Sequence, residues 1–535
     1  MSAPRFDLDL TPFRDADGWA GIDVRYTAEF ESIPAGQPIL RLPKIVASVP
    51  GAPYRPEDLS VTDASGRVSL TEVAGTEDPM SSYRHFIAER DVQGSVEVAV
   101  RAPVRDVDLR TPVGPLFDLR REHLGLFGSG VTFVPVPLSE EREFDFSITW
   151  HLDDGVTAVS SRGVGDEVRR WSGVIESIEH CLFGAGTPII SPEGATNFAI
   201  HAYSDVPFDL DALSTYLRDI HTAMSEFFED EEPQYHVLVR RNPDKGSGGT
   251  SFPSSFAFGY SPTSEVDESD LRTLLAHEMV HNWPRLDEDW TVGSWYTEGA
   301  AEFYSLVLPW RAGILSSEVF AEQLSEMYRR YDANPRRHLA YADAADLFWA
   351  DLRAQTVPYG RGIQYLVHVD AQLRASSNGT ISLDDIVLDI QRAQRRGEKV
   401  RVEGWLQRIE PVLGERARAE YQAMVDGEPV PRPTGLFQGA LQAHPAIAPE
   451  HELGFDIASF QGEPRLVVGL VAGSAAADAG LRDGDELVTR RFSYSAVRDG
   501  STPLELVIRR DGVEQTIRYE PRGRDVPTTD WLVAE

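Results

Sequence analysis

The sequence contains very little of several residue types that often decide a fold. It has one cysteine, Cys181, so no internal disulfide can form, and stability must come from packing alone or from packing together with a bound metal. Only three of the 535 residues are lysine, so nearly all positive charge is arginine. No apolar run approaches the ~20 residues of a membrane-spanning helix, and the sequence does not open with a signal-peptide pattern. We therefore expect a cytoplasmic protein with no membrane partner.

The large excess of acidic residues limits the kinds of partner that the protein is expected to bind. Acidic residues outnumber lysine and arginine by 85 to 51, which gives a formal net charge of −34. Binding to nucleic acid or to an anionic membrane needs a basic surface, so we expect neither as a partner. With 41% hydrophobic and 25% charged residues, the composition is that of a globular protein. A chain of this length exceeds the size at which a single core stops growing, so several domains are expected.

Hydrophobic periodicity divides the first four fifths of the chain into two domains. Residues 1–192 contain short runs that alternate apolar and polar residues, such as EFDFSITW (143–150), separated by proline and glycine. This pattern predicts a β-rich domain of the sandwich type. Residues 193–426 change to helical periodicity around one predicted strand, YHVLVRR (235–241). The second domain is therefore expected to be α+β and mostly α.

Two further segments follow. Residues 427–450 include a proline at every second position of EPVPRP, which excludes helix and predicts an extended linker. Residues 451–535 return to short predicted strands, two of which are joined by the hairpin signal Asp511-Gly512. The chain is thus predicted to be multidomain, with a small β-rich domain at its C-terminal end.

A short segment of the middle domain, HEMVH (277–281), carries the strongest chemical signal. On a helix, residues four apart lie one above the other, so His277 and His281 can present ring nitrogens to one metal ion. Glu278 lies about a third of a turn away, where it can take a proton from a water molecule without being a ligand. Zinc suits two imidazoles and a carboxylate. Two surface histidines on an ordinary helix are the alternative, because the pattern by itself is short.

Three motifs in order resemble the gluzincin zinc peptidases. They are HEMVHNW, WYTEGAAEFY and VPYGRGIQYL, and their arrangement is similar to that of the glycyl aminopeptidase family, which has a thermolysin-like catalytic domain and a C-terminal PDZ domain. The resemblance implies one zinc ion per chain with Glu298 as the third ligand, and Tyr359 as the group that stabilises the oxyanion. It also implies zinc-dependent hydrolysis of peptide bonds in a peptide or protein substrate, by an aminopeptidase. Glu302, one turn further along, competes with Glu298 as the third ligand.

One segment departs from the pattern of aminopeptidases of this clan. Those enzymes usually hold the free amine of the substrate with a glutamate in a Gly-x-Met/Leu-Glu-Asn/His segment. Here Gly248 and Gly249 are present, but Thr250, Ser251 and Phe252 stand where the acidic residue would be. A desolvated ammonium group needs a carboxylate to replace its lost water. An endopeptidase, or a peptide-binding scaffold with vestigial activity, is therefore the alternative, and the segment is expected to bind substrate backbone as an edge strand.

The last segment resembles a PDZ domain. Leu453-Gly454-Phe455 matches the carboxylate-binding loop of that family, and the segment 474–480 matches the helix that follows. The resemblance implies that backbone N–H groups of the loop could capture a C-terminal peptide. Packing of the domain against the catalytic domain is the alternative.

The remaining candidates are interpreted as structural. The sequence has no Gly-x-Ser-x-Gly elbow, no phosphate loop and no Gly-x-Gly-x-x-Gly fingerprint. Cys181 is expected to be a buried thiol, and the acidic run 287–289 is expected to lie solvated in a loop. Other histidines are expected to be satisfied structural residues: His201, His221, His236 and His368.

Overall fold

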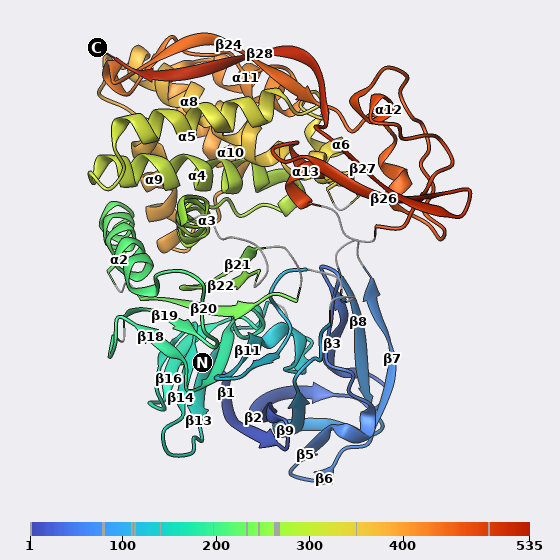
Figure 1. Cartoon of the computed structure of the whole chain (residues 1–535). Helices are drawn as coiled ribbons and strands as arrows, with labels where there is room; N and C mark the ends of the chain where they lie inside the picture. The colour runs from blue at the N-terminus through green and yellow to red at the C-terminus, as the bar shows by residue number, and fades with distance from the viewer. Residues whose placement is uncertain are drawn as a thin grey trace. The chain divides into compact units, whose positions relative to one another are not determined.

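The chain divides into two compact units in the computed structural model. The structure describes residues 3–77, 81–108, 111, 114–139, 141–195, 197–231, 234–243, 247–261, 268–348, 350–489 and 493–534. Unit 1 comprises residues 1–222 and 230–282, and unit 2 comprises residues 223–229 and 283–535. Unit 1 is rich in β-strands and unit 2 is largely helical (Figure 1). A β-rich N-terminal part followed by a helical part agrees with the prediction.

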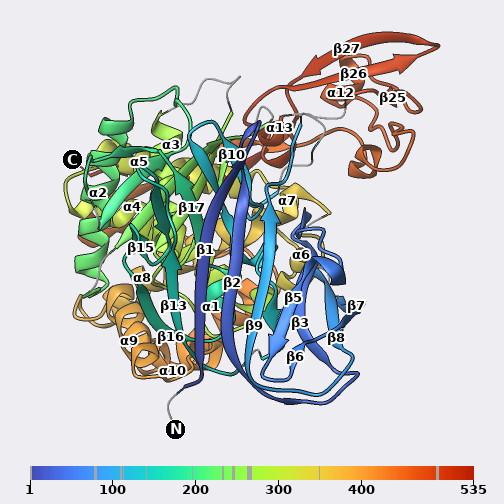
Figure 2. The ribbon, with the colours of Figure 1, turned by 90° about the horizontal axis from the view of Figure 1, so that it is seen from below.

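The largest sheet of unit 1 has seven strands. In spatial order they are β16 (Arg169–Gly173), β13 (Phe144–Trp150), β1 (Arg5–Asp15), β2 (Gly18–Ile33), β9 (Val92–Pro103), β5 (Ser60–Asp63) and β6 (Gly66–Arg67). Strands β13, β1, β2 and β9 run side by side in Figure 2. The alternation predicted for EFDFSITW is confirmed, because Phe144, Phe146, Ile148 and Trp150 are all buried.

Two smaller sheets complete the N-terminal β-structure. One has the order β10 (Arg120–Glu122), β11 (Gly125–Ser129), β17 (Leu182–Gly186), β14 (Thr157–Ser160) and β15 (Gly163–Val164). The other has the order β12 (Val136–Pro137), β3 (Pro38–Val46), β8 (Ser81–Ala88) and β7 (Leu70–Glu77), with β4 (Val49–Pro50) paired to β3. Short helices η1 (Pro56–Asp58), η2 (Gly130–Thr132) and α1 (Glu176–Glu179) lie in the connections. Phe6, Leu40 and Phe183, one from each of the three sheets, belong to one shared hydrophobic core.

The fourth sheet of unit 1 leads into the HEMVH segment. Its order is β18 (Ile189–Ser191), β19 (Phe198–Ala202), β20 (Tyr235–Arg241), β22 (Ser255–Tyr260) and β21 (Gly248–Phe252). Strands β19, β20 and β22 are parallel, and α2 (Leu210–Phe227) forms the connection between β19 and β20. Strand β21 is antiparallel to β22 at the edge, and α3 (Glu268–Val280) follows β22 in the chain. Because β18 pairs with β19, this sheet extends across the predicted boundary at residue 192.

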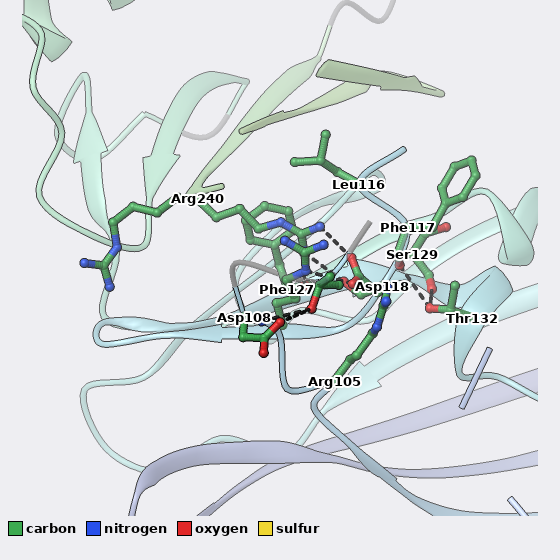
Figure 3. Close-up of polar contacts among 12 residues, drawn as sticks. Arg105, Asp108, Leu116, Phe117, Asp118, Phe127, Ser129, Thr132 and Arg240 are labelled. Carbon is green, nitrogen blue, oxygen red and sulfur yellow. Dashed lines mark hydrogen bonds and ion pairs between the residues drawn. The ribbon is translucent and has the colours of Figure 1, made fainter. Parts of the chain in front are cut away.

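A buried cluster of charges joins β20 to the N-terminal β-structure. Arg240 is fully buried and donates from Nη2 to Asp118 Oδ1 at 2.7 Å and from Nη1 to the Asp118 carbonyl at 2.8 Å (Figure 3). Arg120 and Arg105 donate to Asp118 Oδ2 at 2.7 and 3.0 Å. Burial alone would raise the pKa of Asp118, but the three guanidinium groups hold it below its ordinary value. Asp118 is therefore an ionised anchor between segments far apart in the sequence.

Replacing Asp118 by asparagine is expected to lower the free energy of unfolding by about 3–5 kcal/mol, because it leaves the buried Arg240 without its counter-ion. Urea unfolding followed by circular dichroism would measure the loss as a lower midpoint. Asp106→Asn is the matched control, because the Asp106 side chain is 84% exposed and its partner is Arg121 at the surface. We expect a change of at most ~0.5 kcal/mol there. Equal losses in the two variants would contradict the role given to Asp118.

Unit 2 is built on packed helices. They are α4 (Trp290–Arg311), α5 (Ser317–Asp332), α6 (Tyr341–Asp346), α7 (Leu352–Gln355), α8 (Val357–Ser376), α9 (Leu383–Arg395), α10 (Val402–Leu413) and α11 (Arg416–Val425). Helices α4, α5 and α8 pack against one another (Figure 1). Their stacking explains why the long apolar segments predicted as helices are buried. None of the helices in the described ranges is both long and apolar enough to cross a membrane.

Helices α4 and α8 meet backbone to backbone at two glycines. A Cβ on Gly299 would lie 2.5 Å from the carbonyl carbon of Gly362, and a Cβ on Gly362 would lie 2.1 Å from the carbonyl oxygen of Trp295. Both distances are far shorter than van der Waals contact, so neither position can hold a larger side chain at this separation. The two glycines therefore fix where α4 lies along α8.

The predicted linker is corrected in its second half. Residues 428–433 have no regular structure, but β23 (Gly435–Leu436), η3 (Phe437–Gly439) and β24 (Leu441–His451) follow. Strand β24 pairs antiparallel with β28 (Arg522–Val533), and β28 packs on α5. Beyond its first residues β24 has β28 on one side only, and Pro445 and Pro449 are tolerated on such an edge strand. The prolines that suggested a spacer are thus compatible with a sheet.

Residues 451–521, which are the last residue of β24 and the segment that follows it up to β28, are called the C-terminal module below. It contains η4 (Ile457–Phe460), α12 (Ala475–Asp478), β25 (Glu486–Leu487), α13 (Tyr494–Arg498), β26 (Leu504–Arg510) and β27 (Val513–Tyr519). The predicted hairpin is confirmed, because β26 pairs antiparallel with β27. Asp511 and Gly512 both have positive φ, at 52° and 78°, as a two-residue type I′ turn requires.

Candidate metal centre

The two histidines of HEMVH lie together at the end of α3. His277 is in the last turn of the helix, and His281 follows its last residue, Val280. Their ring centroids are 4.9 Å apart and the ring planes meet at 83°. His277 is 7% exposed and His281 is partly buried. The spacing of four residues thus places both rings on one face, as helical geometry predicts.

Glu298 brings a carboxylate to the two imidazoles. One possible ligand atom from each of His277, His281 and Glu298 lies within 4.8 Å of the other two. Glu298 is 4% exposed on α4, next to the Gly299 contact with α8. Two imidazoles and one carboxylate at this separation fit a zinc ion with ligands at ~2.0–2.1 Å and one open position. In the part of the chain that the structure describes, this is the one group of three or more His, Cys, Asp or Glu side chains with such geometry.

The competing glutamate, Glu302, is partly buried one turn further along α4 and does not belong to this group. Near the start of α4, the hydroxyl of Tyr341 on α6 is hydrogen-bonded to the hydroxyl of Ser294. Burial raises the pKa of Tyr341, the hydrogen bonds to Ser294 and to the Trp295 backbone oppose this shift, and the charge of Glu298 adds a smaller contribution in the raising direction.

Hydrogen bonds fix the end of α3 to the β21–β22 hairpin. Ser251 Oγ on β21 donates to the carbonyl of Glu278 at 3.2 Å. Asn282 accepts from the Ser254 N–H at 2.7 Å and donates to the Met279 carbonyl at 2.9 Å. Sequence reasoning missed Asn282, although its place directly after His281 could have marked it. These contacts hold the backbone of Glu278, whose side chain is partly buried.

The predicted substrate-binding segment forms β21, the edge strand of its sheet. Its two small residues differ in surroundings: a Cβ on Gly248 would meet nothing within 4 Å, whereas a Cβ on Gly249 would lie 1.8 Å from the ring of Phe256. Thr250 Oγ1 accepts from the Leu116 N–H at 2.8 Å. None of the five residues of β21 is acidic, so the strand offers no carboxylate to a substrate amine. The hydroxyls of Thr250 and Ser251 are both hydrogen-bonded inside unit 1.

Tyr359 lies in the first turn of α8, after Pro358, and is partly buried. The residue two positions later, Arg361, is fully buried. It donates to the carbonyls of Arg337 and Leu339 at 2.9 and 2.7 Å and to the hydroxyl of Tyr331 at 2.9 Å. Sequence reasoning read the arginine of PYGRG only as part of a motif. The structure shows it as the anchor of the turn that carries Tyr359.

The remaining histidines lie outside the metal group, but two of them are not fully satisfied. His201 and His236 are buried on neighbouring strands with ring nitrogens 3.5 Å apart. Within the described ranges, no hydrogen-bond partner is found for His201 Nδ1 or for His236 Nε2. Burial lowers the pKa of both rings, that of His236 to about 4, so they are neutral near pH 7. His221 is also buried, and His368 bonds to Glu420 at 3.1 Å.

Two other expectations can be compared with the structure. Cys181 is buried as predicted, and burial raises the pKa of its thiol to about 11. The prediction that the acidic run 287–289 is simply solvated is corrected, because two of its carboxylates accept hydrogen bonds from backbone N–H groups. Asp287 accepts from the Val400 N–H at 2.7 Å and Glu288 from the Val402 N–H at 3.0 Å. These bonds fix the loop that precedes α4.

Comparisons with known proteins agree with this architecture. No protein-family model and no curated protein matches the sequence. The aminopeptidase N family protein from Idiomarina loihiensis is 13% identical, and the match covers 98% of each chain with a TM-score of 0.65. The chain has the M1 zinc metallopeptidase fold. The gluzincin fold implied by the three motifs is supported in this way, and at this level of identity the likeness concerns the fold alone.

Two further solved structures share the fold over most of the chain. A two-domain M1 zinc metallopeptidase with bound L-arginine is 14% identical, covering 81% of this chain and 95% of that one with a TM-score of 0.50. Native yeast LTA4 hydrolase is 16% identical, covering 81% of this chain and 69% of that one with a TM-score of 0.50.

Glu298→Gln is expected to remove most of the zinc bound at equilibrium, because an amide oxygen is a weaker ligand than a carboxylate. The metal content of dialysed protein, measured by mass spectrometry, would show about one zinc per chain in the wild type and a small fraction in the variant. Glu302→Gln is the matched control on the same helix and should keep the wild-type content. Full zinc in Glu298→Gln, or loss of zinc in Glu302→Gln, would move the third ligand away from Glu298.

Proposed function

We propose that the protein is a zinc-dependent peptidase. The convergence of His277, His281 and Glu298, beside a glutamate that is not a member of the group, is the observation that carries the proposal. Zinc, when bound, supplies a Lewis acid that polarises the scissile carbonyl and lowers the pKa of the attacking water. The proposal covers one zinc ion per chain and a peptide or protein substrate.

Glu278 is the proposed proton carrier. It follows the ligand His277 directly, and its backbone is held by Ser251. In the ionised form, its carboxylate accepts the proton of the water that attacks the peptide carbonyl. It then gives that proton to the leaving amine nitrogen, so the carboxylate is regenerated in each turnover.

Tyr359 is the proposed oxyanion donor. Its phenol O–H donates a hydrogen bond to the carbonyl oxygen as negative charge develops there, and one such donor contributes ~2.7–4 kcal/mol to the transition state. The anchoring of the same turn by Arg361 supports this role, because a donor that acts on a transition state needs a fixed position.

The position of β21 at the edge of its sheet fits the binding of an extended peptide. An edge strand leaves backbone N–H and C=O groups that can pair with substrate, and Gly248 to Ser251 lie on that strand. An aminopeptidase is the activity that the motif resemblance implies. A second candidate activity is favoured by Ser251, which stands where an amine-binding glutamate was expected and whose hydroxyl bonds to the Glu278 carbonyl. That candidate is an endopeptidase, which needs no group to hold a free amine.

Capture of a C-terminal peptide by the loop Leu453-Gly454-Phe455 receives little support. Leu453 and Phe455 are buried in the core of the C-terminal module, and the Leu453 carbonyl accepts from the hydroxyl of Tyr519 at 2.6 Å. The residues that follow form the 3-10 helix η4, not an edge strand to which a peptide could add. A peptide-binding scaffold with vestigial activity is therefore the less favoured alternative.

Glu278→Gln is expected to retain zinc and to lower kcat by about 100- to 10,000-fold, because loss of a general base has effects of this size. The assay uses pairs of peptides that differ only in N-terminal acetylation, each with wild type, variant and chelator-treated enzyme. Undiminished hydrolysis by zinc-loaded Glu278→Gln would refute the role of Glu278, and an inactive zinc-loaded wild type would refute the peptidase.

The acetylated peptides separate the two candidate activities. An aminopeptidase would cleave only the free-amine member of each pair, whereas the endopeptidase suggested by Ser251 would cleave both at internal bonds. Mass spectra of the products identify the bond that is cut.

A further inference from the structure

The short helix α7 connects the C-terminal module to the turn that carries Tyr359. It spans Leu352–Gln355 and is separated from the start of α8 by a single residue, Thr356. Tyr359 is thus only seven residues from Leu352. Any displacement of α7 must therefore be taken up within two helical turns of Tyr359.

One side of α7 is fixed by hydrogen bonds to the loop between α5 and α6 and to Asp351, the residue that precedes α7. Arg353 donates to both carboxylate oxygens of Asp351 at 2.8 and 2.7 Å, and Arg336 donates to the same carboxylate at 2.9 Å. Asn334 donates to the Arg353 carbonyl at 2.7 Å and to the hydroxyl of Thr356 at 2.8 Å. Asp351 and Asn334 are almost fully buried, so these bonds are shielded from water.

The other side of α7 is held by the C-terminal module. Leu352 is partly buried and packs against the hydrophobic core of the module, which includes Leu453, Phe455, Ala496 and Val497. Helix α13, which carries Ala496 and Val497, contacts α7. The loop that resembles a carboxylate-binding loop thus shares its apolar core with a side chain from the helical part of the same chain.

Polar contacts fasten the module at the same place. The His451 N–H donates to the Ala333 carbonyl at 2.8 Å, and the His451 ring lies 3.1 Å from the Ala496 carbonyl. Arg337 donates to Glu450, the β24 residue that directly precedes the module, at 2.6 Å. The Arg337 carbonyl in turn accepts from Arg361, the anchor of the first turn of α8. Two routes, one apolar and one polar, therefore lead from the module to Tyr359.

We propose that Leu352 is a positioning residue for Tyr359, and that the C-terminal module acts in the reaction by holding Leu352 in place. The inference rests on the proposed function, because it assigns the module a part in setting the oxyanion donor. The module then works as a fixed support for the active centre and not as a recruiter of peptides.

The experiment compares Leu352→Asp and Leu352→Met, each in the wild type and in Tyr359→Phe. A charge at 352 should expel the side chain from the apolar core and lower kcat by about 10- to 100-fold, with KM within about 2-fold, because a small displacement of a catalytic group has effects of this size. Leu352→Met should stay within about 2-fold of the wild type, since it conserves volume. In Tyr359→Phe, Leu352→Asp should change kcat by less than about 2-fold, because the donor is already absent.

Equal losses of kcat in the two backgrounds, or no loss in either, would overturn the positioning role. Hydrogen exchange provides a readout that does not depend on hydrolysis: amides 357–362 should exchange faster in Leu352→Asp than in wild type. Val513→Asp is the control on the module, since Val513 is 66% exposed on β27, and it should leave both kcat and exchange unchanged. If zinc-loaded wild type hydrolyses nothing, the proposed function fails, while unchanged exchange in Leu352→Asp overturns the positioning role by itself.

Discussion

The backbone contact between α4 and α8 is the constraint on which the candidate centre depends. Gly299 follows Glu298 directly, and Gly362 is three residues after Tyr359. Because no side chain separates the two helices there, the proposed third ligand and the proposed oxyanion donor are fixed relative to each other by main-chain packing. A site that binds a metal and stabilises a transition state needs such rigidity, since errors of about an ångström are costly. The two glycines at this crossing are thus needed for the close approach of the helices and not for backbone flexibility.

Buried arginines also hold distant segments of the chain together. Arg240 binds Asp118 across unit 1, and Arg361, near the start of α8 in unit 2, donates to four oxygens. A planar guanidinium can satisfy several acceptors at once, which a lysine ammonium does less well in a buried site. In a chain with three lysines and a large excess of acid, this chemistry is also the one available. In unit 1 the buried arginine is anchored by a carboxylate, Asp118, and in unit 2 Arg361 is anchored by neutral oxygens.

Local sequence patterns predicted the structure correctly where a single short segment determines it. The alternation of residues 143–150, the Asp511-Gly512 turn and the spacing of the two motif histidines each fix geometry over a few residues. Predictions were wrong or missing where distant segments meet. Strand β24 forms by pairing with β28, some 80 residues later, and the proline-rich segment contains no sequence pattern that predicts this partner. The hydrogen bonds of Ser251 and Asn282, and the packing of Leu352, likewise arise only after folding.

The fold is that of M1 zinc metallopeptidases, and we propose that His277, His281 and Glu298 together hold one zinc ion. X-ray absorption at the zinc edge of the dialysed protein tests it most directly. We expect four or five nitrogen and oxygen ligands at ~2.0–2.1 Å, with the outer-shell scattering of two imidazoles. A protein that retains no zinc, or a spectrum with sulfur at ~2.3 Å or without imidazole scattering, would contradict it.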